Sequence, residues 1–386
     1  MKIYSCLLLG AMFLLGGCSD LLDIDPKNKI PADELFSTPE GVQAHMANLY
    51  GRLPIEDFTY SPNRGFNVGV GTDVNNAGFM AAHFCDEAIH PEYNDFGEEW
   101  FDYWEDGYKL IRDLNSLLVT IPTLTSITEQ QKNEINAETH FLRAYTYFAL
   151  AKRYGGVPII KEPQEYNGNI EELRVPRNTE KDTWDFVLEE CDQAVSLFGD
   201  ANENDVLRAN KWVALALKSR VCLFEGTFRK YHGIADYEKY LDACITASDD
   251  FMKNSGYSLY KTGSTPYQTL FSSLNAIQQE IVLARDYNGT LNIRHDVQGF
   301  ENTASKGRPG LSKKIVNMYL NKNGSRFTDM QGYATKVFFD ECQNRDPRLA
   351  QTIRTPGYIR PGETKQSGPN FSSAMIGYHL IKYSGA

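Results

Sequence analysis

Carboxylates and aromatic rings gather between residues 92 and 106, where the sequence reads EYNDFGEEWFDYWED. A glycosidase needs a pair of carboxyl groups beside a sugar site, so Glu98, Glu99 and Asp102 could serve such a reaction. Acidic residues are also favoured in the first turn of a helix, where the helix dipole stabilises negative charge. We favour this second interpretation, because Glu98 and Glu99 stand at the start of a predicted helix.

Other catalytic and metal-binding motifs are missing from the sequence. It contains no HExxH, GxSxG, P-loop or EF-hand pattern. The run from Gly69 to Val74 begins like a dinucleotide-binding fingerprint, but it lacks the third glycine and a surrounding βαβ pattern. His83 and His90 are seven residues apart, without the carboxylate or cysteine pattern that would complete a metal site. The motifs therefore indicate no catalytic constellation, and we predict no cofactor and assign no metal-binding residue.

Composition narrows the possible partners. The chain of 386 residues has 39 Lys and Arg against 50 Asp and Glu, which gives a formal net charge of −11. This balance excludes the basic surface that nucleic-acid binding requires. Hydrophobic residues make up 42 % of the chain, enough for a folded core, and aromatic residues make up 12 %. Aromatic side chains on an acidic protein are suited to recognition.

The first residues resemble a bacterial lipoprotein signal. Lys2 precedes an apolar run over 3–15 that is too short to span a bilayer. The small residues Gly16 and Gly17 then precede Cys18, as in a lipobox, where the cysteine is acylated and becomes the mature N-terminus. We predict a signal peptide over 1–17 and lipid attachment at Cys18, in preference to an ordinary signal with an incidental cysteine. The spacing of the five later cysteines, at 85, 191, 222, 244 and 342, indicates no disulfide framework, and we predict that they are buried free thiols.

Helical patterns dominate the part of the chain before residue 255. Capping residues such as Thr38 and Thr128 precede apolar residues spaced by three and four, and Gly155 stops the longest run. Long helices joined in this way predict an all-α fold of stacked helical hairpins, similar to tetratricopeptide repeats. After residue 255 the chain becomes rich in loops, with a short strand or edge segment expected over 279–285. The predicted long helices cover 38–53, 98–119, 128–154, 179–198, 210–226 and 237–254.

Several runs resemble the SusD/RagB family of outer-membrane lipoproteins. They occur in the family's order along almost the whole mature chain, which makes the resemblance far more specific than any one motif. The runs begin at Trp104 (WxxxYxxIxxxN), Ala137 (AETHFLRAYTYFAL), Arg153 (RYGGVP), Asn210 (NKWVALALKSRVCL), Gln279 (QEIV), Asn344 (NRDPRL) and Gly377 (GYHLIKY).

The resemblance implies a lipoprotein that is lipid-anchored in the outer membrane, faces the outside of the cell and binds glycan or another nutrient without cleaving it. Such proteins cover a TonB-dependent, SusC-like transporter and pass oligosaccharide to it; some members bind peptide. Their fold implies a helical-repeat domain over 18–254 and a loop-rich region over 255–386. They normally continue past the segment at Gly377 into a further helical region, whereas this sequence ends at Ala386. We therefore expect a fragment, a frameshifted gene or a truncated sequence, in preference to a natural minimal form.

The family's binding surface is built largely from the insertion between the first two helices, here 54–97, with help from the loop-rich second half. Aromatic rings stack on sugar faces, while Arg, Asn and Asp bind hydroxyls. Trp104, Tyr108 and Arg143 are interpreted as scaffold, and Trp100 could equally pack in the core. On location and chemistry, the predicted glycan-binding residues are Arg64, Asp73, Asn76, Phe79, Tyr93 and Trp100.

Two other functions remain open at this stage. A tetratricopeptide-type adaptor or adhesin would bind protein through a helical groove and would lack a transporter partner. A lipid-anchored glycoside hydrolase would use the acidic stretch and would turn over polysaccharide.

Overall fold

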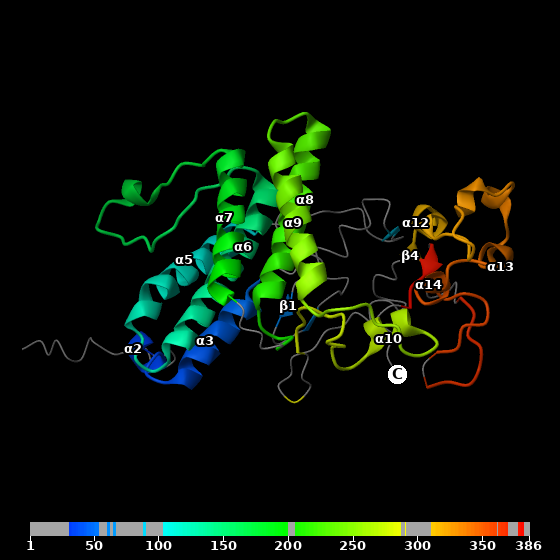
Figure 1. Cartoon of the computed structure of the whole chain (residues 1–386), viewed down its shortest axis with the longest axis horizontal. Helices are drawn as coiled ribbons and strands as arrows, with labels where there is room; N and C mark the ends of the chain where they lie inside the picture. The colour runs from blue at the N-terminus through cyan, green and yellow to red at the C-terminus, as the bar shows by residue number, and fades with distance from the viewer. Residues whose placement is uncertain are drawn as a thin grey trace, which may run out of the picture.

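The computed structural model describes residues 31–53, 60–61, 65–66, 88–89, 103–199, 205–286, 290, 310–360, 362–369 and 377–381. Long helices occupy one side of the molecule, and a loop-rich region with short helices occupies the other (Figure 1). The fold is all-α, as the sequence predicts.

The helical region consists of antiparallel neighbours stacked side by side (Figure 1). Helix α6 packs most extensively against α7, and α8 packs most extensively against α9. Its elements are α2 (Ala32–Leu35), α3 (Pro39–Gly51), α5 (Trp104–Thr120), η3 (Ile121–Thr123), α6 (Glu129–Tyr154), η4 (Ile170–Leu173), α7 (Glu180–Phe198), α8 (Lys211–His232) and α9 (Tyr237–Asn254).

Short elements make up the rest of the described chain. Strand β1 pairs with β2, and β4 lies between β3 and β5 in a three-stranded antiparallel sheet. These elements are β1 (Tyr60–Ser61), β2 (Gly65–Phe66), β3 (Ala88–Ile89), α10 (Pro266–Ser272), β4 (Gly310–Leu311), α12 (Lys313–Met318), η5 (Phe327–Asp329), η6 (Tyr333–Thr335), α13 (Phe338–Glu341), α14 (Pro347–Ala350) and β5 (Tyr378–His379).

Capping side chains set most of the helix starts, as predicted. The Thr38 hydroxyl accepts the backbone N–H of Gly41 at the start of α3. Thr128 and Gln131 form a capping box at the start of α6, in which each side chain bonds the backbone of the other residue. Gly155 ends α6 with a φ of 69°, a backbone conformation that residues with a Cβ rarely adopt.

Two predicted boundaries are wrong. Helix α5 begins at Trp104 rather than near residue 98, so its first-turn acids are Glu105 and Asp106. The backbone N–H of Tyr103 donates instead to the hydroxyl of Tyr154, 2.8 Å away. Glu98 and Glu99 lie outside the described residues, so their interpretation as first-turn acids stays a prediction.

Helix α8 continues through Gly226, where its end was predicted, to His232. A Cβ at residue 226 would lie 2.7 Å from Leu241 Cδ2, so this glycine permits close packing against α9. The true end is Gly233, with a φ of 67°. The strand expected over 279–285 is also wrong, because that segment forms a turn and irregular chain whose Val282 and Leu283 pack against the helices.

The main hydrophobic core lies among α3, α5, α6, α7 and α8. Helix α6 is buried along most of its length, with Tyr147, Phe148 and Leu150 each no more than 1 % exposed. A separate small core of Val316, Leu349 and Ile353 organises the C-terminal segment, meaning residues 310–381. No helix in the described ranges is long and apolar enough to cross a membrane. Free thiols are confirmed at Cys191, Cys222, Cys244 and Cys342, the first two buried and the others half-buried.

Candidate functional site

The residues predicted to bind glycan all lie outside the described part of the chain. The same holds for the predicted lipid-attachment residue, so these assignments stay predictions. Within the predicted insertion over 54–97, the structure describes strands β1, β2 and β3. The residues concerned are Cys18, Arg64, Asp73, Asn76, Phe79, Tyr93 and Trp100.

Strand β3 joins the insertion to the C-terminal segment. Ala88 lies opposite Leu311 of β4, and Gly310 of β4 lies opposite His379 of β5. Helix α12 begins two residues after β4. The end of the insertion is therefore held beside α12 and the loops that follow it.

A buried arginine shapes those loops. The Arg345 guanidinium donates to the backbone carbonyls of Val316, Tyr319 and Glu341 at 2.6–2.9 Å. Its Cζ also lies 3.6 Å from the centre of the Phe327 ring. Because one side chain ties the end of α12 to α13 and stacks on η5, the segment 320–330 between them has a defined path.

A first cavity of about 660 Å³ opens on one side of that segment. Carboxamides, a hydroxyl and two lysines line it, with Phe327 and Met330 as apolar contacts. This mixture of neutral donors and acceptors beside apolar surface suits the hydroxyl rim and C–H faces of a sugar. The polar lining consists of Asn321, Lys322, Asn323, Ser325, Lys336, Asp340, Gln343 and Asn344.

A second cavity of about 590 Å³ lies on the other side of the segment. Lys313, Lys314 and Arg326 line it, and no acidic residue does. The Oδ1 atom of Asn317, which also lines this cavity, is buried without a hydrogen-bond partner. Sequence reasoning assigned the second half of the chain a supporting role but predicted no residue of either cavity as a binding residue.

Exposed rings occur on α8. Phe224 and Phe228 stack with parallel rings, 6.4 Å between centroids and 6° between planes, and are 36 % and 40 % exposed. Tyr231, one turn further along the same face, is 82 % exposed. These rings were missed at the sequence level, although their spacing of four and three places them on one helical face.

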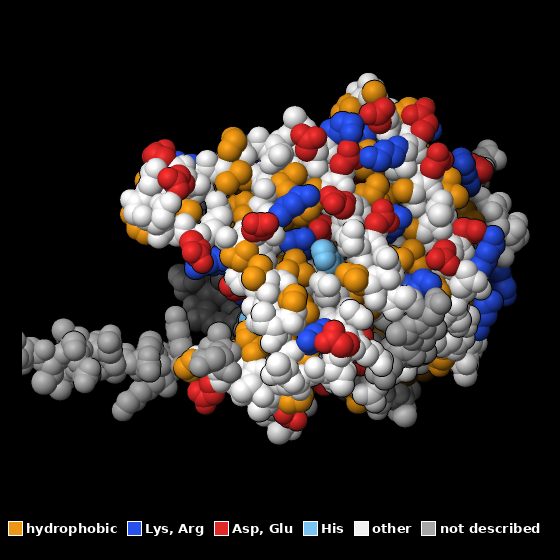
Figure 2. All heavy atoms as spheres, turned by 60° about the vertical axis from the view of Figure 1, so that its left-hand side comes forward, with side chains coloured by type: hydrophobic (Ala, Val, Ile, Leu, Met, Phe, Trp, Pro, Cys, Tyr) orange, Lys and Arg blue, Asp and Glu red, His pale blue; other side chains and the backbone are white. Residues whose placement is uncertain are grey.

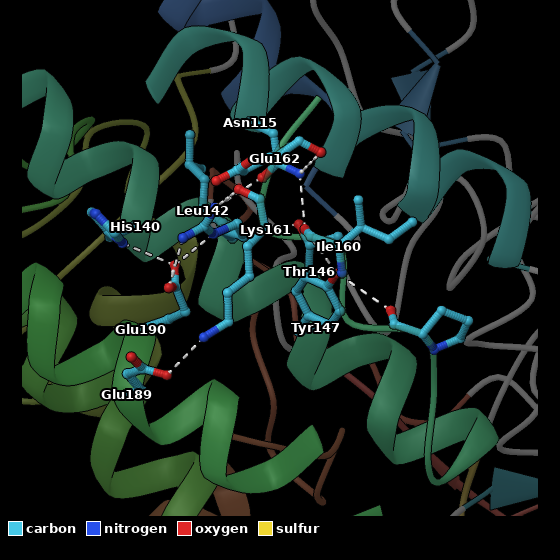
Figure 3. Close-up of polar contacts among 12 residues, drawn as sticks. Asn115, His140, Leu142, Thr146, Tyr147, Ile160, Lys161, Glu162, Glu189 and Glu190 are labelled. Atoms are coloured by element: carbon cyan, nitrogen blue, oxygen red, sulfur yellow. Dashed lines mark hydrogen bonds and ion pairs between the residues drawn. The ribbon is translucent and has the colours of Figure 1, made fainter. Parts of the chain in front are cut away.

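The polar network around Arg143 is scaffold, as predicted. Arg143 donates to both carboxylate oxygens of Glu190 at 2.7 Å and to Asn115 Oδ1 at 2.8 Å. Asn115 in turn donates to the carbonyl of Ile160 (Figure 3). Thus α5, α6 and α7 are joined to the extended chain after α6 by groups that do not face solvent.

The charge of Glu190 is stabilised by its neighbours. Burial opposes its ionisation, but hydrogen bonds and charges from His140 and Arg143 outweigh that effect and hold the pKa of Glu190 below its usual range. His140 Nδ1 lies 2.9 Å from the carboxylate, and the two side chains face each other in Figure 3. A carboxylate this well paired serves structure rather than proton transfer.

Trp104 and Tyr108 also belong to the scaffold. Their rings pack at 5.0 Å between centroids, and Tyr108 donates to the carbonyl of Pro158 at 2.8 Å. No group of three or more His, Cys, Asp or Glu residues suited to a metal occurs in the ranges that the structure covers.

Comparisons with known proteins identify similar sequences. A SusD-like family model described as "Starch-binding associating with outer membrane" matches residues 20–223. A SusD-like protein of Bacteroides ovatus is 25 % identical over 277 residues, which cover 71 % of this chain and 48 % of that protein. SusD-like protein P25 of Formosa agariphila is 23 % identical over 292 residues, covering 72 % and 50 %. The chain thus spans about half the length of these relatives.

Solved structures share the fold. A SusD-like protein of Bacteroides fragilis gives a TM-score of 0.57 at 22 % identity, over 92 % of this chain and 71 % of that one. A SusD-like carbohydrate binding protein of the same species gives a TM-score of 0.62 at 20 % identity, over 90 % and 68 %. Because the family model covers more than half of the 386 residues and the helical stack superposes on SusD-like folds, this chain belongs to the SusD-like family.

Proposed function

We propose that this protein is a non-catalytic, cell-surface receptor for oligosaccharide that delivers its ligand to a TonB-dependent, SusC-like transporter. The observation that carries the proposal is the match of residues 20–223 to a family described as starch-binding and associated with the outer membrane. The likeness in fold to a SusD-like carbohydrate binding protein adds support. The chain's own chemistry is compatible, since the described cavities carry amides, lysines and apolar contacts.

Anchoring and recognition would work together in this function. The lipobox-like sequence at Cys18 would tie the protein to the outer membrane. Shallow sugar sites give modest affinity, because much of the ligand stays in water and few contacts offset the loss of its freedom. Holding the receptor beside a transporter raises the effective concentration of captured ligand and so compensates for weak binding.

Affinity electrophoresis tests the binding function. The protein, preferably with the whole length of its gene product, is run through native gels that contain members of a neutral and acidic polysaccharide panel. Retardation by at least one polysaccharide, with no new reducing ends after long incubation, is the expected result. Retardation by none of them would contradict glycan binding, and release of reducing ends would contradict a non-catalytic role.

The predicted binding residues are tested in the same gels. Alanine at Arg64 or Tyr93 should weaken retardation by the polysaccharide that binds, because each removes a hydrogen-bonding or stacking group. A thermal melt of each variant controls for misfolding. Unchanged mobility of both well-folded variants would reject this site assignment.

The transporter partnership is tested by purification. The protein, carrying an affinity tag, is extracted from outer membranes in mild detergent. A SusC-like barrel that co-purifies in near-equal amount is expected. Recovery of the protein without any barrel would contradict the partnership.

A further inference from the structure

The two cavities of the C-terminal segment share one wall. Ser325 and Phe327 face the first cavity, whereas the alternate residues Arg326 and Thr328 face the second. Arg326 has an extended backbone (φ −67°, ψ 135°) and leads into the 3-10 helix η5, which contains Phe327 and Thr328, so neighbouring side chains of this segment point in different directions. A ligand that crosses the segment would therefore meet both sets of side chains.

The charge of this region is opposite to that of the whole molecule. Six Lys or Arg and three Asp or Glu lie between residues 310 and 345, whereas the whole chain has a net charge of −11. On the face shown in Figure 2, acidic and basic side chains are interspersed. A local excess of positive charge next to two cavities attracts anions.

The positive groups are available to a ligand. In the described part of the chain, the side chains of Arg326 and Lys322 make no hydrogen bond or ion pair, and both residues are exposed. Lys313 Nζ lies 3.0 Å from Glu341 Oε1 and keeps other donor positions, because an ammonium carries three hydrogens. Glu341 also accepts a 2.6 Å hydrogen bond from the Tyr378 hydroxyl.

Neutral hydrogen-bonding groups stand beside these charges. Asn321 donates its amide to Ser325 Oγ, which leaves its carbonyl oxygen for a ligand. Gln343 donates its amide to the carbonyl of Phe339 and likewise keeps its oxygen. The buried Oδ1 of Asn317, which has no hydrogen-bond partner, can accept a hydrogen bond from a ligand hydroxyl in the second cavity.

We propose that these paired cavities bind an acidic polysaccharide, with its carboxylate or sulfate groups on Arg326 and Lys313 and its hydroxyls on the carboxamides of Asn321 and Gln343. This inference rests on the proposed glycan-binding function and names the class of glycan. The amide-rich cavity favours a sugar over a lipid headgroup, which would offer charge but few hydroxyls. Strand β3 pairs with β4, which leads into α12 beside the second cavity.

The test compares polysaccharides that share a backbone and differ in charge. Polygalacturonate is paired with its methyl ester, and a sulfated galactan is paired with agarose, in affinity gels and in titration calorimetry. The protein should bind at least one acidic member more tightly than its neutral partner. Raising NaCl from about 50 to 300 mM should weaken that binding and leave neutral binding nearly unchanged, since salt screens charges.

Single variants test whether the preference for acidic polysaccharide arises from the paired cavities. Arg326→Gln should weaken binding of the acidic polysaccharide about fivefold or more, because a charge-assisted hydrogen bond is lost, while Arg326→Lys should retain part of the affinity. Lys230→Gln removes the same charge from the exposed surface of α8 and should bind like the wild type. The Arg326 side chain makes no hydrogen bond or ion pair in the described residues and is exposed, so its replacement should leave the melting temperature unchanged.

The outcomes separate this inference from the proposed function. Binding of neutral and acidic members with equal affinity, or full acidic binding by Arg326→Gln, would overturn the inference and leave glycan binding standing. Binding to anionic lipid vesicles without binding to any polysaccharide would overturn both. A loss of affinity in Lys230→Gln equal to that in Arg326→Gln would show that overall charge, rather than the site, sets the preference.

Discussion

At the scale of single residues, Arg143 and Glu190 form a deeply buried ion pair. The two side chains are 6 % and 3 % exposed. A buried ion pair adds little net stability over apolar packing, but removing one partner leaves the other charge in a medium that solvates it poorly. Its role is therefore to fix the geometry among three helices.

The variant Arg143→Met should lower the free energy of unfolding by about 3–5 kcal/mol, because it leaves the Glu190 carboxylate buried without its guanidinium. Urea denaturation followed by circular dichroism measures the change. Lys109→Met, which breaks an exposed pair with Glu105, is the control and should leave stability almost unchanged, because water and salt screen exposed charges.

The double variant Arg143→Met/Glu190→Met should recover much of that loss, since no charge is then left buried. If the double variant is as unstable as the single one, packing rather than charge explains the effect.

A second buried carboxyl group, Glu225 on α8, makes stability depend on pH. Its side chain is fully buried. Burial raises its pKa, and the hydrogen bond and charge of Glu180 raise it further, against the opposing charge of Arg229. The folded protein therefore holds a proton that the unfolded chain releases near pH 4.3, so stability falls as the pH rises from there toward the raised pKa.

The variant Glu225→Gln should remove this dependence, because its amide stays neutral. Between pH 5 and pH 8, the free energy of unfolding should fall less steeply for the variant than for the wild type. The difference between the two slopes should be at most about 1.4 kcal/mol per pH unit. Glu165→Gln, which changes an exposed residue, should follow the wild-type profile. Parallel profiles for wild type and Glu225→Gln would contradict this assignment.

At the scale of helices, the contact between α8 and α9 depends on Gly226. An alanine Cβ there would lie 2.7 Å from Leu241 Cδ2 and 3.1 Å from the Leu241 backbone nitrogen. Gly226→Ala should therefore lower the melting temperature, with a cost of about 1–3 kcal/mol from overpacking that exceeds the gain in helix propensity. Differential scanning calorimetry measures the shift.

Gly51 provides a matched comparison for that prediction. It ends α3, and a Cβ there would meet nothing within 4 Å. Gly51→Ala should leave stability unchanged or raise it by up to about 1 kcal/mol. A lower melting temperature for Gly51→Ala than for Gly226→Ala would contradict the packing argument.

Local signals explain which helices could be predicted from the sequence. Thr38, Thr128 and Asn210 each cap a helix through their own side chains, within three residues of the bond they accept, so their sequence context is sufficient. The start of α5 depends on Tyr154, 51 residues away from Tyr103, which no local pattern reveals. The end of α8 was wrongly predicted at Gly226, because the sequence alone does not distinguish a glycine that ends a helix from one that allows two helices to pack closely.

The cavities of the candidate site could not be predicted from the sequence. The family resemblance pointed to loops of the insertion and of the second half of the chain, but the cavities depend on how Arg345 stacks on Phe327 and binds three carbonyls. Such contacts join residues without periodicity, so hydrophobic patterns give no hint of them. The family assignment succeeded because its motifs lie mainly on helices whose packing constrains the residue types.

At the scale of the whole molecule, we propose that a lipid anchor at Cys18 sets the location of the protein. Cys18→Ala should move the protein from the membrane fraction to the soluble fraction and abolish labelling by radioactive palmitate, because the acyl chains supply the membrane affinity. Cys6→Ala changes a cysteine within the predicted signal and should leave both readouts unchanged. Membrane retention of a labelled Cys18→Ala protein would contradict the assignment.

The pairing of β3 with β4 also has a consequence for how the chain reaches its final form. Ala88 meets Leu311 across more than 200 intervening residues, whereas α6 to α9 contact their neighbours in sequence. Closing so long a loop is slow compared with docking adjacent helices. The helical stack should therefore assemble first, and the sheet beside the proposed site should close last. Any event that delays the arrival of residue 310 should thus leave a folded helical stack in which the proposed site is not yet assembled.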